Sequence, residues 1–338
     1  MRMHSIHMKQ KIAIFMGGFS AEHSISLKSG QVVFDSLDGN IYQKFKVIIS
    51  EDGWTCFDEL GQACTIDKSD LSIHTDTKVI KPDCVFIAIH GNPGENGVLQ
   101  SYLDMIEMPY TGCGAYQSAL TFNKRDTLSV LKEIDIPCAT SFLLNRGDFI
   151  NLDNILSKVG LPCFVKANCA GSSYGVSKVT EKAQLQKAIE TAFDVDDNIL
   201  IESCLKGTEV SVGVITYQGD ILALPITEII TDNEFFDFQA KYLGQSQEIT
   251  PARISAELTA KVHNLAIKIF KHLSLSGFSR SEFIIQDGIP HFLEINTVPG
   301  LTKESILPQQ ADAAGIGLTE LFGNAVQEAL QKVKKLNR

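Results

Sequence analysis

The chain contains no long apolar segment, no C-x-x-C pair and no run of basic residues. A membrane-spanning helix needs about 18 or more consecutive apolar residues, so no such helix is predicted. The eight cysteines are scattered without zinc-type Cys/His spacing, which predicts reduced, mostly buried thiols and a cytoplasmic protein. The net charge of −10 argues against a nucleic acid or an anionic membrane as the main partner.

Two common nucleotide-binding motifs are also missing. Neither G-x-x-x-x-G-K-[ST] nor G-x-G-x-x-G occurs, which argues against a Walker-type loop and a dinucleotide-binding fold. Internal repeats and low-complexity segments are absent as well. With 338 residues, of which 44% are hydrophobic and 21% charged, the chain is expected to form two or three globular domains.

The most informative segment is 277–300, GFSRSEFIIQDGIPHFLEINTVPG. Two apolar runs flank an Asp-Gly turn, which predicts a β-hairpin. Arg280 and Glu282 are two residues apart on one strand and share a face, and Glu294 and Asn296 repeat this spacing on the other strand. One face then carries three oxygen ligands suited to Mg²⁺ and a guanidinium suited to a phosphate or an oxyanion. An ordinary amphipathic hairpin with solvated charges is the alternative.

A second segment, 162–179, reads PCFVKANCAGSSYGVSKV. Two short apolar runs surround the Gly/Ser sequence at 171–175, which predicts two strands joined by a flexible loop. The backbone N–H groups and serine hydroxyls of such a loop can bind phosphate oxygens. Lys166 enters the loop and supplies a cation. The alternative is a flexible surface hairpin without a ligand.

The first third of the chain predicts an α/β domain with a small-molecule site. The buried strand at 11–16 is followed by a Gly-Gly turn and by a helix with Ser20 as its N-cap. Glu22, near that helix start, either compensates the helix dipole or binds an ammonium group. His90 follows the apolar strand predicted at 78–89 and opens a glycine-rich loop, a position where open α/β sheets carry function.

The later segments supply further candidates. A single helix is predicted at 115–132, and Lys124 lies within it. The apolar strand at 198–202 runs into a short loop containing Glu209, which fits an adenosine pocket. The segment 231–249 mixes aromatic and charged residues without clear periodicity. A segment of this kind inside a compact domain is typical of a lid or a binding loop.

Taken together, these segments resemble the ATP-grasp superfamily and, within it, the D-alanine–D-alanine ligase family. The resemblance covers nearly the whole chain. Each piece alone is only moderately specific, but their order and spacing make the match strong. The matching pieces are GGFSAEHSISL, IAIHGNPGENGVLQ, YTGCG, FNK, LPCFVKANCAGSSYGVSKV, EFFDFQAKY, GFSRSEF and LEINTVPGLTKESILPQ.

The resemblance implies a mixed α/β and α+β fold of three domains in the ATP-grasp arrangement. These are an N-terminal parallel α/β substrate domain at 1–112, a central domain at 113–201 and a C-terminal domain at 202–338 with a lid at 231–249. The last two clasp ATP. The implied reaction joins two D-alanines through a D-alanyl phosphate, giving D-alanyl-D-alanine, ADP and phosphate for peptidoglycan synthesis. The implied protein is a cytoplasmic homodimer without nucleic-acid or membrane partners.

The resemblance also implies a role for each matching residue. ATP would be bound by Lys124, Lys166, Ser172, Ser173, Glu202, Leu205, Glu209 and Lys241. Two Mg²⁺ ions, or Mn²⁺ in their place, would be held by Glu282, Glu294 and Asn296. The catalytic set would be Glu22 on the first ammonium group, Arg280 on the tetrahedral intermediate, Ser172 and Tyr242. The D-alanines would also contact His90, Gly300, Ser305 and Ile306.

The chain departs from the family pattern at three places. Ala170 stands where the family commonly has a glutamate, and the metal strand reads Arg-Ser-Glu at 280–282 where Arg-x-Asp is usual. The sequence at 122–124 is Phe-Asn-Lys, where Met-Asp-Lys is common. The longer Glu282 side chain puts the metal geometry most in question.

Two other functions stay open. A ligase with D-serine or D-lactate as acceptor is the first, although Tyr242 favours an amino acceptor. The second is a nucleotide-binding module without catalysis, and the intact Lys166 and Arg280 argue against it.

Overall fold

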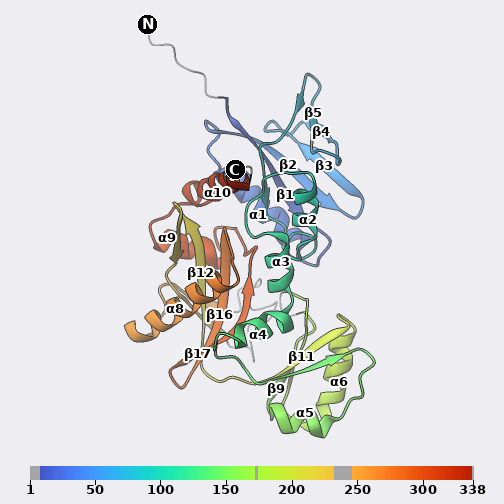
Figure 1. Cartoon of the computed structure of the whole chain (residues 1–338), viewed down its shortest axis with the longest axis vertical. Coiled ribbons are helices and arrows are strands. Elements are labelled where there is room, and N and C mark those ends of the chain that lie inside the picture. Colours follow the sequence, from blue (N-terminus) through green and yellow to red (C-terminus); the bar gives the residue numbers. More distant parts are fainter. Residues whose placement is uncertain (1–7, 172–173, 232–245, 337–338) are drawn as a thin grey trace.

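The computed structural model describes residues 8–171, 174–231 and 246–336 (Figure 1). It is a mixed α/β protein with three sheets, as the resemblance implies. The three sheets follow one another along the long axis of the molecule, with the first sheet at one end and the central sheet at the other. In the described part of the chain no helix is long and apolar enough to cross a membrane.

The first sheet has seven strands in the order β6-β5-β4-β3-β2-β1-β7, and β1 pairs in parallel with both β2 and β7. Successive residues of β1 point to opposite faces of the sheet. Ile12 and Ile14 face α1 and α10, while Ala13 and Phe15 face α2. A strand covered on both faces must be apolar throughout, as this one is. The bounds are β1 Gln10–Gly17, β2 Tyr42–Ser50, β3 Gly53–Phe57, β4 Ala63–Ile66, β5 Ile73–His74, β6 Val79–Ile80, β7 Cys84–Ile87, α1 His23–Ser36 and α2 Val98–Met105.

The central sheet is antiparallel, in the order β10-β9-β11-β8. The helices α5 and α6 cover it, and their apolar residues pack with those of the sheet in one core. Two further helices, α3 and α4, precede the sheet in the chain. The bounds are α3 Ala115–Phe122, α4 Lys124–Lys132, β8 Ser141–Asn145, α5 Leu152–Val159, β9 Cys163–Ala167, β10 Ser177–Val179, α6 Lys182–Phe193 and β11 Asn198–Ser203.

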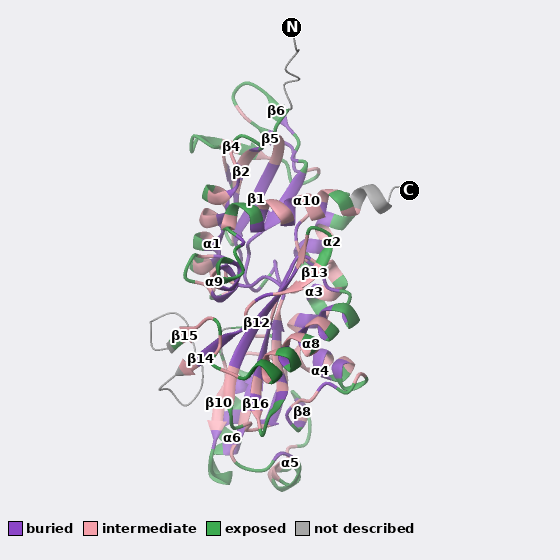
Figure 2. Ribbon diagram, turned by 90° about the vertical axis from the view of Figure 1, so that its left-hand side faces the viewer, coloured by how far each residue is buried: buried purple, intermediate pink, exposed green. Residues whose placement is uncertain are grey.

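The third sheet has the order β15-β14-β12-β16-β17, with β13 paired to β12. Its central strand β12 is buried along most of its length (Figure 2), because α8 packs on one side and α9 and α10 on the other. The bounds are β12 Thr208–Tyr217, β13 Asp220–Ala223, β14 Thr227–Thr231, β15 Ser246–Ile249, α8 Ala256–His272, β16 Phe278–Gln286, β17 Ile289–Asn296, α9 Ile306–Ala313 and α10 Leu318–Leu336.

Three local predictions are wrong. The single helix expected at 115–132 is two helices, because Asn123 is extended and starts a new helix with its own side chain. Ser20 is not the N-cap of α1, because the helix begins at His23 with Glu22 in the N-cap position; the Ser20 hydroxyl accepts from the N–H of Glu22 and donates to the carbonyl of His90. The strand expected at 78–89 is divided into β6 and β7.

Candidate active site

The β16–β17 hairpin forms where the sequence predicts it. Arg280 lies opposite Asn296 and Glu282 lies opposite Glu294. Directly opposite residues of an antiparallel pair point to the same face, so the four side chains share one face of the hairpin. A β-bulge directly after Glu282 shifts the register of the rest of the hairpin.

A cavity between the central and third sheets brings together most of the residues expected to bind ATP. Phe164, Ile284 and Leu293 give it apolar walls, and its polar residues come from both sheets and from α4. An apolar cavity with a few convergent polar groups is the usual form of a nucleotide or cofactor site. Its lining includes Lys124, Lys166, Glu202, Leu205, Glu209, Glu282 and Glu294.

Lys166 and Glu202 form an ion pair in this cavity. They project from neighbouring strands β9 and β11, and both residues are less than a tenth exposed. A buried charge of either sign is costly alone, so each side chain offsets the charge of the other and holds it in place. The carboxylate of Glu202 therefore contacts a lysine in this structure, and its contact with adenine stays a prediction.

Lys124, the first residue of α4, connects the loop after β9 with the hairpin. Its Nζ donates to the carbonyl of Ala170 at 2.7 Å and lies 3.5 Å from Oε2 of Glu294. The backbone carbonyl of Ala170 thus helps to hold the lysine side chain in place. The same loop approaches the first domain, because a Cβ added at Gly171 would lie 3.0 Å from Oε2 of Glu22.

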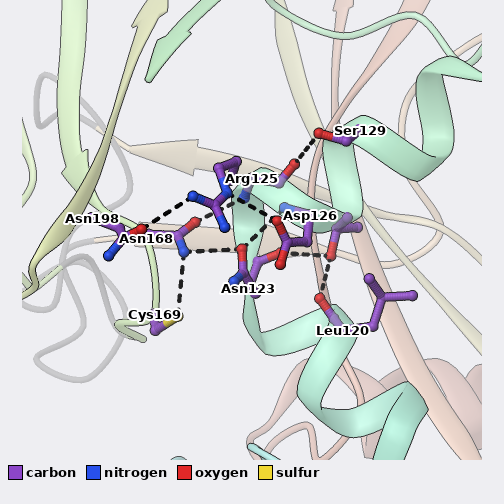
Figure 3. A network of polar contacts seen from close by, with 9 residues as sticks. Leu120, Asn123, Arg125, Asp126, Ser129, Asn168, Cys169 and Asn198 are labelled. Carbon is purple, nitrogen blue, oxygen red and sulfur yellow. Dashed lines mark hydrogen bonds and ion pairs between the residues drawn. The ribbon is translucent and has the colours of Figure 1, made fainter. Parts of the chain in front are cut away.

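The sequence analysis missed a polar network at the start of α4 that includes Asn123 and Asn168 (Figure 3). The side chain of Asn123 caps α4 by accepting from the N–H of Asp126 at 3.0 Å. Asn168, at the end of β9, hydrogen-bonds to both Asn123 and Arg125. Asparagine directly before a lysine-rich helical segment is an N-cap signal, so this helix start was detectable in the sequence.

A second, polar cavity adjoins the first, and Lys124 and Glu294 line both. In this cavity the residues predicted to contact the first D-alanine lie beside the predicted metal and arginine residues of the hairpin. Of the predicted site residues it is lined by Glu22, His90, Arg280, Asn296 and Gly300, and Glu95 also contributes. Residues from the first, central and third sheets therefore meet at one place, as the predicted function requires.

His90 is buried in the wall of this cavity, with a ring that is fixed at both nitrogens. Nδ1 lies 2.7 Å from the carbonyl of Val298, and Nε2 lies 2.8 Å from the hydroxyl of Ser29. Burial lowers the pKa of His90, although the negative charge of Glu22 opposes this effect. The imidazole is then neutral, donates from Nδ1 and accepts at Nε2, and connects the first domain to the segment after β17.

Glu95 is a further residue that the sequence analysis missed. It is 7% exposed, and its Oε2 accepts the N–H of Gly91 at 2.7 Å. Burial, and next the negative charge of Glu22, raise the pKa of Glu95 to about 8. Its carboxyl is therefore largely protonated at neutral pH. Nothing in its local sequence predicts this, because the pKa depends on burial.

Arg280 is oriented by two neighbours. Its Nη1 donates to the hydroxyl of Ser211 at 3.1 Å, and the guanidinium forms an ion pair with Glu282. Ser211 is fully buried on β12, directly opposite Glu282 in the β12–β16 register. The guanidinium can therefore occupy only a small range of positions.

The residues expected at the second D-alanine lie at the start of α9. A Cβ added at Gly300 would lie 2.6 Å from Oγ of Ser305, so only glycine allows this approach. Ser305 is the N-cap of α9, and Ile306 is its first residue. Gly300 lines the polar cavity, whereas the described lining does not include Ser305 or Ile306. Ser172, Ser173, Lys241 and Tyr242 lie outside the described residues, so their positions stay predictions.

The donor atoms of the hairpin fit a hard divalent cation. Glu282, Glu294 and Asn296 offer only oxygen, the ligand type that Mg²⁺ and Mn²⁺ favour. Among the described residues no group of three or more His, Cys, Asp and Glu side chains is placed to hold a metal. The three candidate ligands of the hairpin are two glutamates and one asparagine, so they do not form such a group.

Comparison with known proteins identifies the family of this chain. Family profiles described as D-ala D-ala ligase N-terminus and C-terminus match residues 11–113 and 130–327. A D-alanine–D-alanine ligase of Christiangramia forsetii is 55% identical over 325 residues, covering 96% of this chain and 100% of the relative.

Two solved structures show the same fold. The D-alanine–D-alanine ligase of Coxiella burnetii has a TM-score of 0.86 at 26% identity, covering 97% of this chain and 96% of that one. The VanG D-Ala:D-Ser ligase of Enterococcus faecalis has a TM-score of 0.83 at 28% identity, covering 95% of this chain and all of that one. The chain therefore belongs to the D-alanine–D-alanine ligase family.

Proposed function

We propose that this chain joins two D-alanines at the expense of ATP, giving D-alanyl-D-alanine, ADP and phosphate for peptidoglycan synthesis. The observation that carries the proposal is the pair of adjoining cavities that share Lys124 and Glu294. The first cavity has apolar walls and two lysines, which suit a nucleoside triphosphate. The second is polar and suits an amino acid whose carboxylate reaches the γ-phosphate.

The nucleotide enters the first cavity. Lys124 and Lys166 bind its phosphate oxygens, with Ser172, Ser173 and Lys241 closing on the same groups. Leu205 and Glu202 hold the adenine, and Glu209 accepts from the ribose hydroxyls. Lysine side chains neutralise charge on the phosphoryl group in flight, which is the main requirement of phosphoryl transfer.

The first D-alanine binds in the second cavity with its ammonium group on Glu22. One oxygen of its carboxylate attacks the γ-phosphorus, the bond from that phosphorus to the bridging oxygen breaks, and ADP leaves. His90 is neutral and hydrogen-bonded at both nitrogens, so it shapes this cavity without adding charge. Water must be excluded at this stage, because an acyl phosphate hydrolyses readily.

The second D-alanine binds at Gly300, Ser305 and Ile306. Its free amine attacks the carbonyl carbon of the acyl phosphate, the C–O bond to phosphate breaks, and the amine loses a proton as the peptide bond forms. Arg280 stabilises the negative oxygen of the tetrahedral intermediate, which needs a cation held in a fixed position. Ser211 and Glu282 provide that positioning.

Two Mg²⁺ ions, or Mn²⁺ ions, would be held by Glu282, Glu294 and Asn296. When bound, they neutralise the β- and γ-phosphate oxygens and make the γ-phosphorus more electrophilic. The chain's contribution is a set of oxygen ligands on one rigid hairpin face. We further propose that the protein acts in the cytoplasm as a homodimer.

The deciding experiment measures phosphate release and product formation by the purified chain with ATP and Mg²⁺. D-alanine is expected to increase phosphate release, and mass spectrometry is expected to identify D-alanyl-D-alanine. Competing D-serine or D-lactate tests the acceptor, with the dipeptide expected as the main product. Phosphate release that does not depend on D-alanine contradicts the proposal. If the main product contains D-serine or D-lactate, the proposed acceptor is wrong.

A further inference from the structure

The end of β9 and the start of α4 are joined by one buried residue, Asn168 (Figure 3). Asn168 is 2% exposed, and all its polar groups are hydrogen-bonded. Its N–H donates to the carbonyl of Asn198 at 3.0 Å, and its carbonyl accepts from the N–H of Lys124 at 3.3 Å. Its side-chain Oδ1 accepts from the N–H of Arg125 at 2.8 Å, and Nδ2 donates to Oδ1 of Asn123 at 2.9 Å.

These bonds satisfy N–H groups at the start of α4 that have no partner within the helix. The first N–H groups of an α-helix have no partner within the helix. At α4 the N–H groups of Lys124 and Arg125 are satisfied by Asn168 and not by solvent. The helix that carries Lys124 is thereby fixed to the strand that carries Lys166. Lys124 is then held at its other end as well, where Nζ donates to the carbonyl of Ala170 at 2.7 Å.

We propose that Asn168 is a positioning residue for a nucleoside triphosphate, with ATP named on the basis of the proposed function. Its amide sets the distance between α4 and β9, and so holds Lys124 and Lys166 where both reach the same phosphates. Both lysines line the nucleotide cavity, whereas Asn168 lies behind it and acts through them. Replacement by alanine removes the side-chain bonds to Asn123, Arg125 and Cys169 and lets the start of α4 move away from β9.

The test measures the Kd of a non-hydrolysable ATP analogue with Mg²⁺ by titration calorimetry, without D-alanine. Asn168→Ala is expected to raise the Kd at least fivefold. The matched control is Asn151→Ala, which removes the N-cap of α5, where Asn151 accepts from the N–H of Asn154 at 3.0 Å. This control is expected to stay within twofold of the wild type. A rise below fivefold for Asn168→Ala, or an equal rise in the control, overturns the proposal.

A second pair of variants tests the contact between Asn168 and α4 from the side of Asn123. It replaces the first test if Asn168→Ala does not fold. Asn123→Ala removes the acceptor for Nδ2 of Asn168 and is expected to raise the Kd. Asn123→Asp retains an oxygen at that place and an N-cap, and is expected to restore the Kd to within twofold of wild type. Equal weakening by both substitutions contradicts the role of Asn168.

Turnover assays separate this inference from the proposed function. Asn168→Ala is expected to raise the KM for ATP, with kcat lowered less than twofold and the KM for D-alanine unchanged. A purely stabilising role would lower the unfolding midpoint and leave the KM for ATP as it was, which overturns the inference. A wild-type chain that binds the analogue but forms no dipeptide contradicts the proposed function alone.

Discussion

The ion pair between Lys166 and Glu202 gives a prediction whose size follows from its burial. The two side chains are 9% and 5% exposed. Replacing Glu202 by glutamine removes one charge and leaves the lysine charge buried. Breaking a buried pair in this way costs about 3–5 kcal/mol, and the remaining amide oxygen favours the lower end of that range. We therefore expect a loss of about 3 kcal/mol in the free energy of unfolding without nucleotide.

This loss converts into a measurable temperature. The entropy of unfolding is about 0.7 kcal/mol per kelvin for a chain of this length, if it unfolds as one unit. The melting temperature of Glu202→Gln without nucleotide is then expected to fall by about 4 °C. ATP brings negative charge to Lys166, so the rise in melting temperature on adding ATP and Mg²⁺ should be larger in the variant than in the wild type.

Differential scanning calorimetry with and without ATP measures both effects. The control is Glu257→Gln, the same chemical change in the exposed pair of Glu257 and Lys261 on α8, whose atoms are 2.8 Å apart. This control is expected to leave the melting temperature unchanged, because exposed pairs contribute little. An unchanged melting temperature in Glu202→Gln, or a smaller ATP-induced rise than in the wild type, refutes the argument that Glu202 compensates the charge of Lys166.

Four further predictions concern the site. Glu294→Gln is expected to lower Mg²⁺-dependent turnover by roughly 100-fold with an unchanged melting temperature; near-normal phosphate release removes Glu294 from the metal site. The pKa of Glu95 is raised to about 8 from 4.5, so the folded chain retains a proton that the unfolded chain loses and stability falls between these pH values. Glutamine does not titrate, so the urea midpoint of Glu95→Gln should rise relative to that of the wild type from pH 5 to pH 8. A difference between the two midpoints that does not change with pH contradicts the raised pKa. Ser211→Ala removes one hydrogen bond to Arg280 and is expected to lower kcat about fivefold, for a lost hydrogen bond of about 1 kcal/mol, with the KM for ATP unchanged; a changed KM for ATP alone contradicts this. Tyr242→Phe is expected to raise the ratio of depsipeptide to dipeptide when D-lactate and D-alanine compete, and an equal ratio places specificity elsewhere.

Local patterns predicted the hairpin but not its register. The two-residue spacing of Arg280 and Glu282, repeated by Glu294 and Asn296, required only strand periodicity. The register next to the turn, continued without interruption, would place Glu282 opposite Leu293, and the β-bulge between Glu282 and Phe283 brings Glu294 opposite Glu282. The parallel strand β1 was also visible as an unbroken apolar run, since both of its faces are buried.

Other features depend on contacts distant in sequence. The strands β3, β4 and β5 are short and partly exposed, and they form by successive antiparallel pairing, β3 with β2, β4 with β3 and β5 with β4. The side chain of Asn168 looks like an ordinary loop asparagine until α4 is placed beside it. The pKa of Glu95 likewise follows from burial, which no spacing of residues along the chain reveals.

The core that joins the two ends of the chain has a consequence for synthesis on the ribosome. Ile12 and Ile14 of β1 pack in one cluster with Leu321, Phe322 and Val326 of α10. The chain is made from its N-terminus, so the part of this face that α10 covers stays open until α10 has been made, although α1 can cover the rest earlier. The apolar surface left open in the meantime is a site for chaperone binding or aggregation. Synthesis of α10, and not completion of the first sheet, is therefore the step at which this part of the protein can acquire its final packing.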